Sequence, residues 1–269
     1  MIRGMTSTTR TAKTALVTGA SAGLGLELAR LAAKDGHDLV LVARRRERLE
    51  ALAAELTAAH GVQVIVIAAD LSDQAAPAAI AQRLRADGKQ IDFLINNAGF
   101  GSCGPFSKAV LEREVEMVHL NIRALMQLTH LFLPEMLARK SGRILNVASV
   151  AGFLAGPYMA TYYASKAFVL SFTEALSSEL VGTGVTITAS CPGPTKTEFG
   201  TVAGNHKTEL FKRNVAQAAP VARHAYRAMM AGKVVAIPGL MNKLIAQSTR
   251  ISPRAWLRAI AASLNRSRT

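Results

Sequence analysis

The sequence predicts an α/β fold built on one doubly wound, parallel β-sheet, and two observations lead to that prediction. Seven short runs of apolar, β-prone residues recur along the 269 residues, and segments with helical spacing of apolar residues separate them. The runs are almost continuously apolar, which is typical of strands that helices cover on both faces. We therefore expect seven parallel strands with helices on both faces of the sheet.

Six of the seven runs are followed by a plausible helix or loop crossover. The strands are expected at 15–18, 39–42, 62–67, 93–95, 144–147, 185–188 and 234–237. The helices are expected at 24–34, 47–59, 74–86, about 108–138, and 160–181. Pro134 lies inside the long stretch, and proline lacks the N–H that a helix interior requires, so we expect a kink or an end near Leu133.

Composition predicts one globular domain rather than several. Half of the residues are hydrophobic and 19% are charged, which suits a single sizeable core over 13–239, preceded by a disordered tail over 1–12. No apolar run reaches 18 residues without a charge, so we expect no transmembrane segment. The two cysteines, Cys103 and Cys191, are too few for a disulfide scaffold and indicate a reducing compartment, for which we expect the cytoplasm.

The net charge of +14 is concentrated near the C-terminus. Residues 14–204 carry 17 basic and 17 acidic side chains, whereas 205–269 carry 12 basic side chains and one acid. No nucleic-acid-binding motif accompanies this charge, and we expect no nucleic-acid partner.

Residues 240–269 form a basic, helical C-terminal extension that Pro253 divides in two. We favour a packing helix with a solvated basic face. The alternatives are contact with an anionic membrane surface, an acidic carrier protein or a CoA phosphate.

A glycine-rich turn between the first strand and the first helix predicts a phosphate-binding loop. Glycines let the backbone turn sharply and approach a phosphate, and the helix that follows offers free N–H groups. The loop has the spacing Gly-x-x-x-Gly-x-Gly and contains Gly19, Ser21, Gly23, Leu24 and Gly25.

Tyr162 and Lys166 are the strongest candidates for proton transfer. They lie four residues apart on an expected helix and so share one face. A nearby cation favours the phenolate, which lowers the pKa of the tyrosine towards the range of a general acid or base. Tyr158 and Tyr163 lack a lysine four residues further on and are poorer candidates.

The second strand ends without the acidic residue that holds the ribose 2′-hydroxyl of NAD. Ala43 occupies that position, and Arg44 and Arg45 follow. Guanidinium groups can pair with a 2′-phosphate, so this strand end favours NADP(H) over NAD(H).

Over residues 12–240, these motifs, with Asn-Asn-Ala-Gly at 96–99, resemble the short-chain dehydrogenase/reductase family. The resemblance implies a Rossmann-like, NADP-binding catalytic domain and no metal. It also implies reduction of a ketone, or oxidation of a secondary alcohol, in a small hydrophobic carbonyl or acyl substrate. The run 190–199 is most similar to the subgroup of DltE-type, 17β-hydroxysteroid and 3-ketoacyl reductases. A non-catalytic NADPH-binding regulator with the same fold is the alternative.

The resemblance assigns the catalytic roles to Asn121, Ser149, Tyr162 and Lys166. Tyr162 exchanges the proton with the substrate oxygen, which Ser149 orients. Lys166 binds the nicotinamide ribose and lowers the pKa of Tyr162, and Asn121 holds a water that links Lys166 to solvent. The implied cofactor contacts are Gly19, Ser21, Gly23, Leu24, Gly25, Arg44, Arg45, Asp70, Leu71, Asn97, Ala98, Gly99, Tyr162, Lys166, Pro192, Gly193 and Thr195.

Two departures from the family pattern matter. Ala22 stands where many NADPH-preferring members have a basic residue, so cofactor choice depends on Arg44 and its neighbours. The basic C-terminus replaces the ending through which family tetramers often pack. A homo-oligomer is still expected, as a tetramer or as a dimer through helices 108–133 and 160–181. The expected substrate-lining residues are Phe100, Phe153, Leu154, Met159, Phe199 and Phe211.

Overall fold

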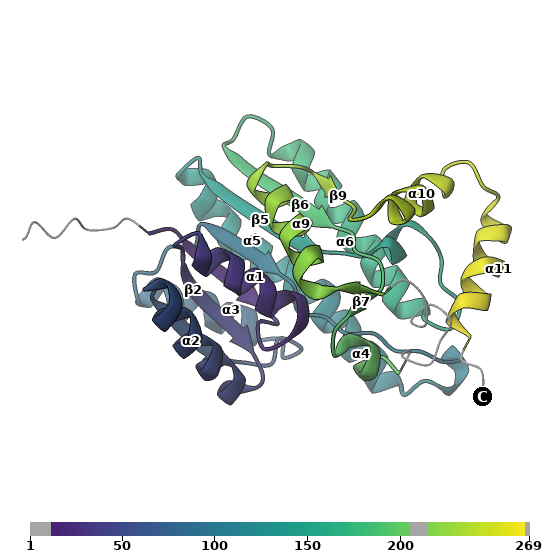
Figure 1. Cartoon of the computed structure of the whole chain (residues 1–269), viewed down its shortest axis with the longest axis horizontal. Coiled ribbons are helices and arrows are strands. Elements are labelled where there is room, and N and C mark those ends of the chain that lie inside the picture. Colours follow the sequence, from purple (N-terminus) through teal and green to yellow (C-terminus); the bar gives the residue numbers. More distant parts are fainter. Residues whose placement is uncertain (1–11, 205–214, 267–269) are drawn as a thin grey trace, which may run out of the picture.

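The computed structural model describes residues 12–204 and 215–266, and a seven-stranded parallel sheet forms its centre (Figure 1). The strand order is β3-β2-β1-β4-β5-β6-β9, which confirms the predicted doubly wound α/β fold. The strands are β1 (Thr14–Thr18), β2 (Asp38–Ala43), β3 (Val64–Ala68), β4 (Phe93–Asn96), β5 (Gly142–Val147), β6 (Val185–Ser190) and β9 (Val235–Ala236). Residues 1–11 of the predicted tail lie outside the described residues, and so does Phe211, which we expected to line the substrate side.

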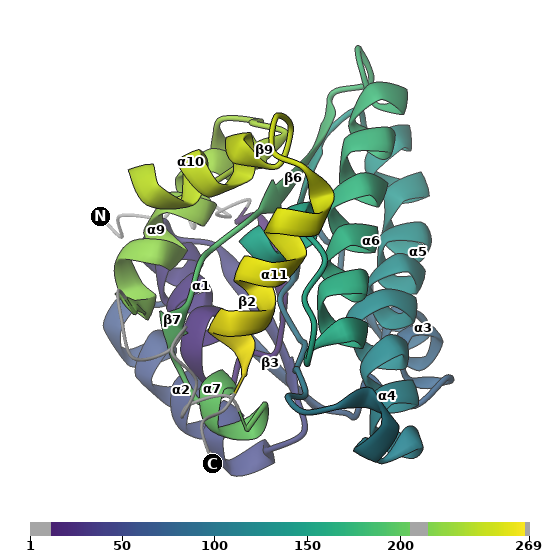
Figure 2. The same ribbon diagram turned by 90° about the vertical axis from the view of Figure 1, so that its right-hand side faces the viewer.

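Helices cover both faces of the sheet (Figure 2). One layer consists of α1 (Gly23–Lys34), α2 (Arg46–His60) and α9 (Ala218–Met230). The other consists of α3 (Ala76–Ala86), α5 (Leu125–Ala138) and α6 (Ala160–Glu179). Side chains on alternate positions of the strands therefore enter two separate apolar cores, which explains the continuous apolar runs of the sequence.

The remaining elements lie around the ends of the strands. They are η1 (Phe106–Lys108), α4 (Leu111–Val118), η2 (His119–Ala124), η3 (Val150–Phe153), α7 (Phe199–Val202), the small parallel pair β7 (Thr195–Lys196) and β8 (Ala216–Gln217), α10 (Leu240–Ser248) and α11 (Arg254–Asn265).

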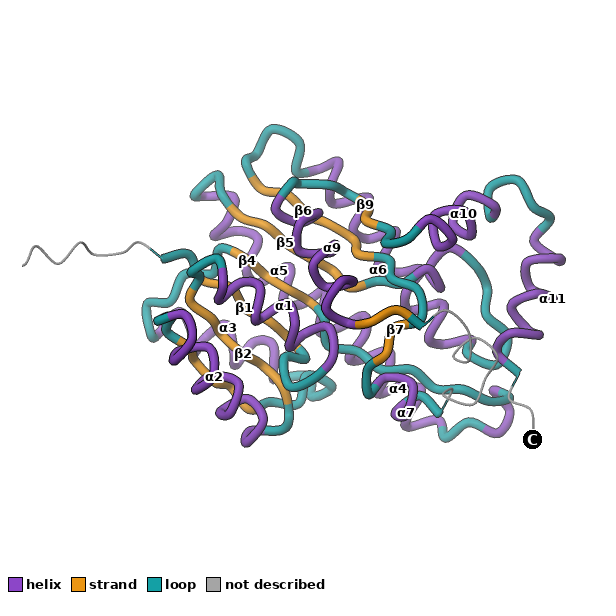
Figure 3. Tube along the Cα trace, in the orientation of Figure 1, coloured by secondary structure: helices purple, strands orange, loops and turns teal. Residues whose placement is uncertain are grey.

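The strand order reverses direction beside β1. Leu16 of β1 pairs with Val40 of β2 on one side and with Leu94 of β4 on the other, so the chain winds outward in both directions from this point. Figure 3 shows the strands running side by side through the molecule. In a sheet of this kind, ligands bind beyond the carboxyl ends of the strands at the reversal.

The long helical stretch differs from its prediction. We expected a kink or an end near Leu133; Pro134 lies inside α5, which continues to Ala138, so the expected end is wrong. Phe132 and Met136, on either side of the proline, are buried against the sheet, and this packing holds the helix together across one missing hydrogen bond. An irregularity that the sequence did not indicate lies earlier, at the π-helical turn η2, and π turns are frequent at functional sites.

A chain of buried polar side chains connects the central strands to the helices behind them. The Nδ2 atom of Asn96 donates to Asn146 Oδ1 at 2.9 Å and to Thr129 Oγ1 at 3.2 Å. The Nδ2 atom of Asn146 donates to Thr173 Oγ1 at 3.0 Å. The network therefore fixes β4 and β5 relative to α5 and α6, immediately below the strand ends that bear the candidate site.

Thr173→Val should test this network. The substitution conserves shape but removes the partner of a fully buried amide, so we expect the free energy of unfolding to fall by about 1–3 kcal/mol. The control is Thr188→Val, because the equally buried Thr188 hydroxyl has no hydrogen-bond partner among the described residues. Urea denaturation should show an unchanged or higher stability for the control, and equal losses in the two variants would contradict the assignment.

Candidate functional site

A cleft of about 650 Å³ opens at the carboxyl ends of the strands. Its walls come from the loops after β1, β2, β3, β4, β5 and β6, and from α10 and α11. This volume lies within the ordinary range of cofactor and small-molecule sites.

The loop between β1 and α1 forms a tight anion cradle. Gly19 and Gly23 adopt the left-handed conformation, with φ of +66° and +57°. A Cβ atom at Gly25 would collide with the carbonyl oxygen of Gly19, so the loop packs directly on the first turn of α1. No described side chain caps that helix at Ala22, which leaves its first N–H groups available to an anionic group in the cleft.

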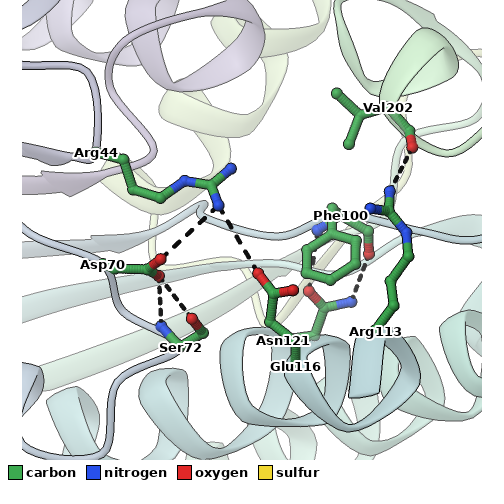
Figure 4. A network of polar contacts seen from close by, with 8 residues as sticks. All are labelled: Arg44, Asp70, Ser72, Phe100, Arg113, Glu116, Asn121 and Val202. Carbon is green, nitrogen blue, oxygen red and sulfur yellow. Dashed lines mark hydrogen bonds and ion pairs between the residues drawn. The ribbon is translucent and has the colours of Figure 1, made fainter. Parts of the chain in front are cut away.

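Two arginines after β2 border the same cradle. Arg45 donates to the hydroxyl of Ser21 at 3.1 Å. Arg44 lies between two carboxylates, 3.8 Å from Asp70 and 3.7 Å from Glu116 (Figure 4). These ion pairs are long and solvent-exposed, and such pairs contribute little free energy. The Arg44 guanidinium can therefore exchange them for a closer, bidentate anion.

Tyr162, Lys166 and Ser149 meet at the inner end of the cleft. Lys166 Nζ donates to the carbonyl oxygen of Val147 at 2.7 Å and lies 5.8 Å from the centre of the Tyr162 ring. The Ser149 hydroxyl accepts from Ala151 N at 3.1 Å and lies 3.3 Å from the Pro192 carbonyl oxygen, to which it donates. Helix α6 and the end of β5 thus bring the three side chains together.

Burial shifts the acid–base behaviour of both residues on α6. It raises the pKa of the Tyr162 phenol well above its usual value, although hydrogen bonding to Ser149 acts in the opposite direction. Burial also lowers the pKa of the Lys166 ammonium to about 8. Burial therefore dominates the pKa of Tyr162 in this arrangement, and the expected lowering of that pKa by Lys166 stays a prediction. At neutral pH the phenol is a proton donor.

Asn121 lies behind the cleft rather than in its wall. It belongs to the π turn η2 and is almost fully buried. Its side chain binds both the backbone N–H and the carbonyl oxygen of Phe100 (Figure 4). Its Oδ1 accepts from Phe100 N at 3.1 Å, and its Nδ2 donates to Phe100 O at 2.9 Å and to Ser165 Oγ at 3.1 Å. The side chain therefore fixes the loop after β4, while its expected water-holding role stays a prediction.

All other expected cofactor contacts except Gly25 line the cleft. Asn97 joins the first and fourth strands there, because its backbone N–H donates to Thr18 Oγ1 and its side chain donates to Thr18 O, both at 2.9 Å. Thr195 Oγ1 donates to Gly193 O at 2.9 Å, which shapes the loop after β6. Gly25 lies directly beneath the loop that it supports.

The substrate side of the cleft is apolar, and four of the five described residues that we expected there line it. Phe100, Leu154, Met159 and Phe199 line it. Phe153 instead packs into a separate apolar cluster beside α6, because η3 turns it away from the cleft.

Sequence reasoning missed a wall of the cleft that the C-terminal helices supply. We expected these helices to pack on the body of the protein with a solvated basic face. They do pack on the body, and they do so at the cleft itself. The apolar spacing of 257, 261 and 264 is the helical signal for a buried face on α11. The lining side chains are Asn242, Ile245, Ser248, Thr249, Leu257, Ile260, Ala261 and Leu264.

A buried asparagine holds α11 in this position. Asn265 Oδ1 accepts from the Tyr163 hydroxyl at 3.3 Å, and its Nδ2 donates to Pro157 O at 3.1 Å. Arg266 donates to the Tyr158 hydroxyl at 3.0 Å. The two rival phenols therefore bind the C-terminal segment, and Tyr162 is the phenol beside Lys166 and Ser149.

Within 12–204 and 215–266, no helix has the length and apolarity needed to cross a bilayer. In the same part of the chain, no three His, Cys, Asp or Glu side chains are grouped as metal ligands.

Comparison with known proteins places these features in one family. Residues 13–208 match the family model described as short chain dehydrogenase. The ketoacyl reductase HetN of Nostoc sp. (strain PCC 7120) is 41% identical over 186 residues, which span 69% of this chain and 64% of that relative's length.

Two solved structures share the fold over most of their length. One is a short-chain dehydrogenase from Sphingobium yanoikuyae in complex with NADPH, with 36% identity, a TM-score of 0.80, and coverage of 88% of this chain and 93% of that one. The other is a short-chain dehydrogenase/reductase from Burkholderia phymatum in complex with NAD, with 27% identity, a TM-score of 0.78, and coverage of 89% and 92%.

Proposed function

This chain belongs to the short-chain dehydrogenase family, and we propose that it is an NADPH-dependent reductase that reduces the ketone of a hydrophobic substrate or oxidises the corresponding secondary alcohol. The main support for this proposal is that Tyr162, Ser149 and Lys166 line the same cleft as the anion-binding loop. A protein that only bound a nucleotide would have no need of a buried phenol, hydroxyl and ammonium at the far end of that cleft.

The residues of the chain supply proton transfer and orientation. When bound, a nicotinamide cofactor supplies the hydride. The protonated phenol of Tyr162 donates its proton to the carbonyl oxygen as negative charge develops there. The Ser149 hydroxyl exchanges its Pro192 partner for the same oxygen and holds it in place. The ammonium of Lys166 stabilises the phenolate that Tyr162 becomes.

The preference for NADP(H) rests on the end of β2. Ala43 carries no carboxylate that would repel a 2′-phosphate, and Arg44 and Arg45 both line the cleft. The uncapped start of α1 and the glycine cradle fit the pyrophosphate. The named neighbours bind NADPH in one case and NAD in the other, so these side chains carry the argument.

The apolar wall around Phe100, Met159 and Leu264 supports a hydrophobic ketone or acyl substrate. The relative from Nostoc is named a ketoacyl reductase, which agrees with this chemistry.

We also propose a homo-oligomer, because Leu111, Val115 and Val118 form an exposed apolar row along α4. We propose further that residues 13–239 form the catalytic domain. A cytoplasmic location is proposed as well, because it suits the free thiols of both cysteines.

Tyr162→Phe should separate catalysis from binding. Removing the proton donor should lower kcat for ketone reduction by at least about 100-fold while NADPH still binds. NADPH oxidation against a panel of hydrophobic ketones and ketoacyl compounds gives the rate, and fluorescence titration gives the affinity. Tyr158→Phe is the control, since its hydroxyl contacts Arg266 outside the cleft. Retained turnover in Tyr162→Phe would refute the assignment, and NADPH binding without any turnover by the unaltered chain would favour a regulator.

Arg44→Gln should alter cofactor selectivity. Loss of one guanidinium–phosphate pair should raise KM for NADPH by about tenfold, corresponding to 1–2 kcal/mol, with little change for NADH. The matched control is Arg46→Gln, because Arg46 pairs with Glu50 on α2 and does not line the cleft. Parallel initial-rate measurements with the two cofactors decide the matter, and equal changes for both would contradict a 2′-phosphate contact.

The pH profile of reduction should follow Lys166. Its pKa is lowered to about 8, so the stabilising positive charge is present below that pH and is lost above it. We therefore expect kcat/KM, which reports groups of the free enzyme, to fall as the pH rises through this value. Lys166→Arg keeps its charge throughout and should remove the fall, even at a lower rate. A profile of the unaltered enzyme that stays level up to pH 10 would contradict this role.

A further inference from the structure

The two C-terminal helices expose an unusual amount of apolar surface. They lie together at one end of the molecule, beyond the carboxyl ends of the strands (Figure 1). Six apolar side chains there are each more than half exposed: Leu240, Met241, Leu244, Ile251, Trp256 and Ile260. We call this set the C-terminal apolar surface. Burial against the cleft does not account for it, because the cleft takes the adjacent face of α11, with Leu257, Ala261 and Leu264.

Basic side chains accompany the apolar ones without any acidic residue. Residues 240–266 contain no Asp or Glu, and their five basic side chains are all exposed: Lys243, Arg250, Arg254, Arg258 and Arg266. The described residues show no ion pair for any of the five. The surface therefore combines exposed hydrocarbon with concentrated positive charge.

This combination selects one kind of partner. A second copy of the same surface would bring two sets of positive charges together, which disfavours self-association through it. An anionic bilayer instead accepts both features, because apolar side chains enter the acyl boundary while basic groups reach the lipid phosphates. Tryptophan is especially favourable at that depth, and Trp256 is the only tryptophan of the chain.

We propose that the C-terminal apolar surface docks the protein on the surface of a membrane that contains anionic lipids. Leu240, Met241 and Leu244 occupy one side of α10 by helical spacing, and Trp256 and Ile260 occupy one side of α11. Ile260 belongs both to this surface and to the wall of the cleft, so docking places the cleft mouth beside the lipid. The proposal rests on exposure and charge, and it stands independently of the catalytic assignment.

Vesicle binding by the full chain tests the proposal directly. Phosphatidylcholine vesicles with about 30% phosphatidylglycerol carry the negative surface that the proposal requires, whereas pure phosphatidylcholine vesicles do not. We expect co-sedimentation with the anionic vesicles only, weakened by added salt, and a blue shift of the Trp256 fluorescence on binding. Absence of sedimentation would overturn the proposal, as would binding without a tryptophan shift, which would indicate another surface.

Paired variants identify the surface. Arg254→Gln combined with Arg258→Gln should weaken binding to anionic vesicles by about 30-fold, since each basic residue contributes about fivefold. Lys34→Gln combined with Lys233→Gln removes the same charge from the amino-terminal edge of the sheet and should have little effect. Leu244→Ser should weaken binding, whereas Val181→Ser, at an even more exposed valine after α6, should not.

The outcomes separate the alternative partners. Equal losses in the surface and control variants would show general charge attraction and would refute a defined docking surface. Retention of the protein by an acidic carrier protein, together with no binding to either vesicle type, would likewise refute membrane docking. All the substituted side chains are exposed, so these variants should keep the thermal unfolding midpoint of the unaltered chain.

Discussion

The hydrogen bond from Lys166 Nζ to the carbonyl oxygen of Val147 is the contact on which the candidate site depends. It joins the first part of α6 to the last residue of β5, and it places Tyr162 one helical turn away on the same face. The same burial that makes the contact strong also removes water from both titrating groups. The phenol is therefore kept protonated and the ammonium is brought closer to neutrality, which are opposite shifts with one physical cause.

That contact can form only because the layers behind it are fixed. The chain of amides and hydroxyls from Asn96 through Asn146 to Thr173 sets the distance between β5 and α6. On the other side of the cleft, Asn121 sets the position of the Phe100 backbone. Proton transfer is sensitive to small errors in distance, and the hydrogen bonds of these buried polar side chains restrict the movement of the strands and helices that they join. The apolar cores therefore supply stability, while these few asparagines supply alignment.

The sequence reveals those features that local patterns determine. Continuous apolar runs identify the seven strands, and parallel strands must end at one edge, so residues after different strands meet there. The π turn at 119–124, the continuation of α5 through Pro134 and the turning away of Phe153 depend instead on packing against distant segments. The pKa of Tyr162 is a similar case, because a lysine at i+4 is visible in the sequence but the degree of desolvation is not.

The C-terminal helices show how one segment can serve two surfaces. A helix that packs on a body by one face and meets water on the other needs only a narrow apolar stripe. On α11 the stripe is wider than the cleft can cover, since Trp256 and Ile260 extend it into solvent. Residues 14–204 have balanced charge, whereas the extension over 240–269 carries six basic side chains and no acid, so it forms a positively charged end of the molecule. An anionic surface would therefore attract the molecule by the end that carries the mouth of the cleft, and orientation and access would follow from the same residues.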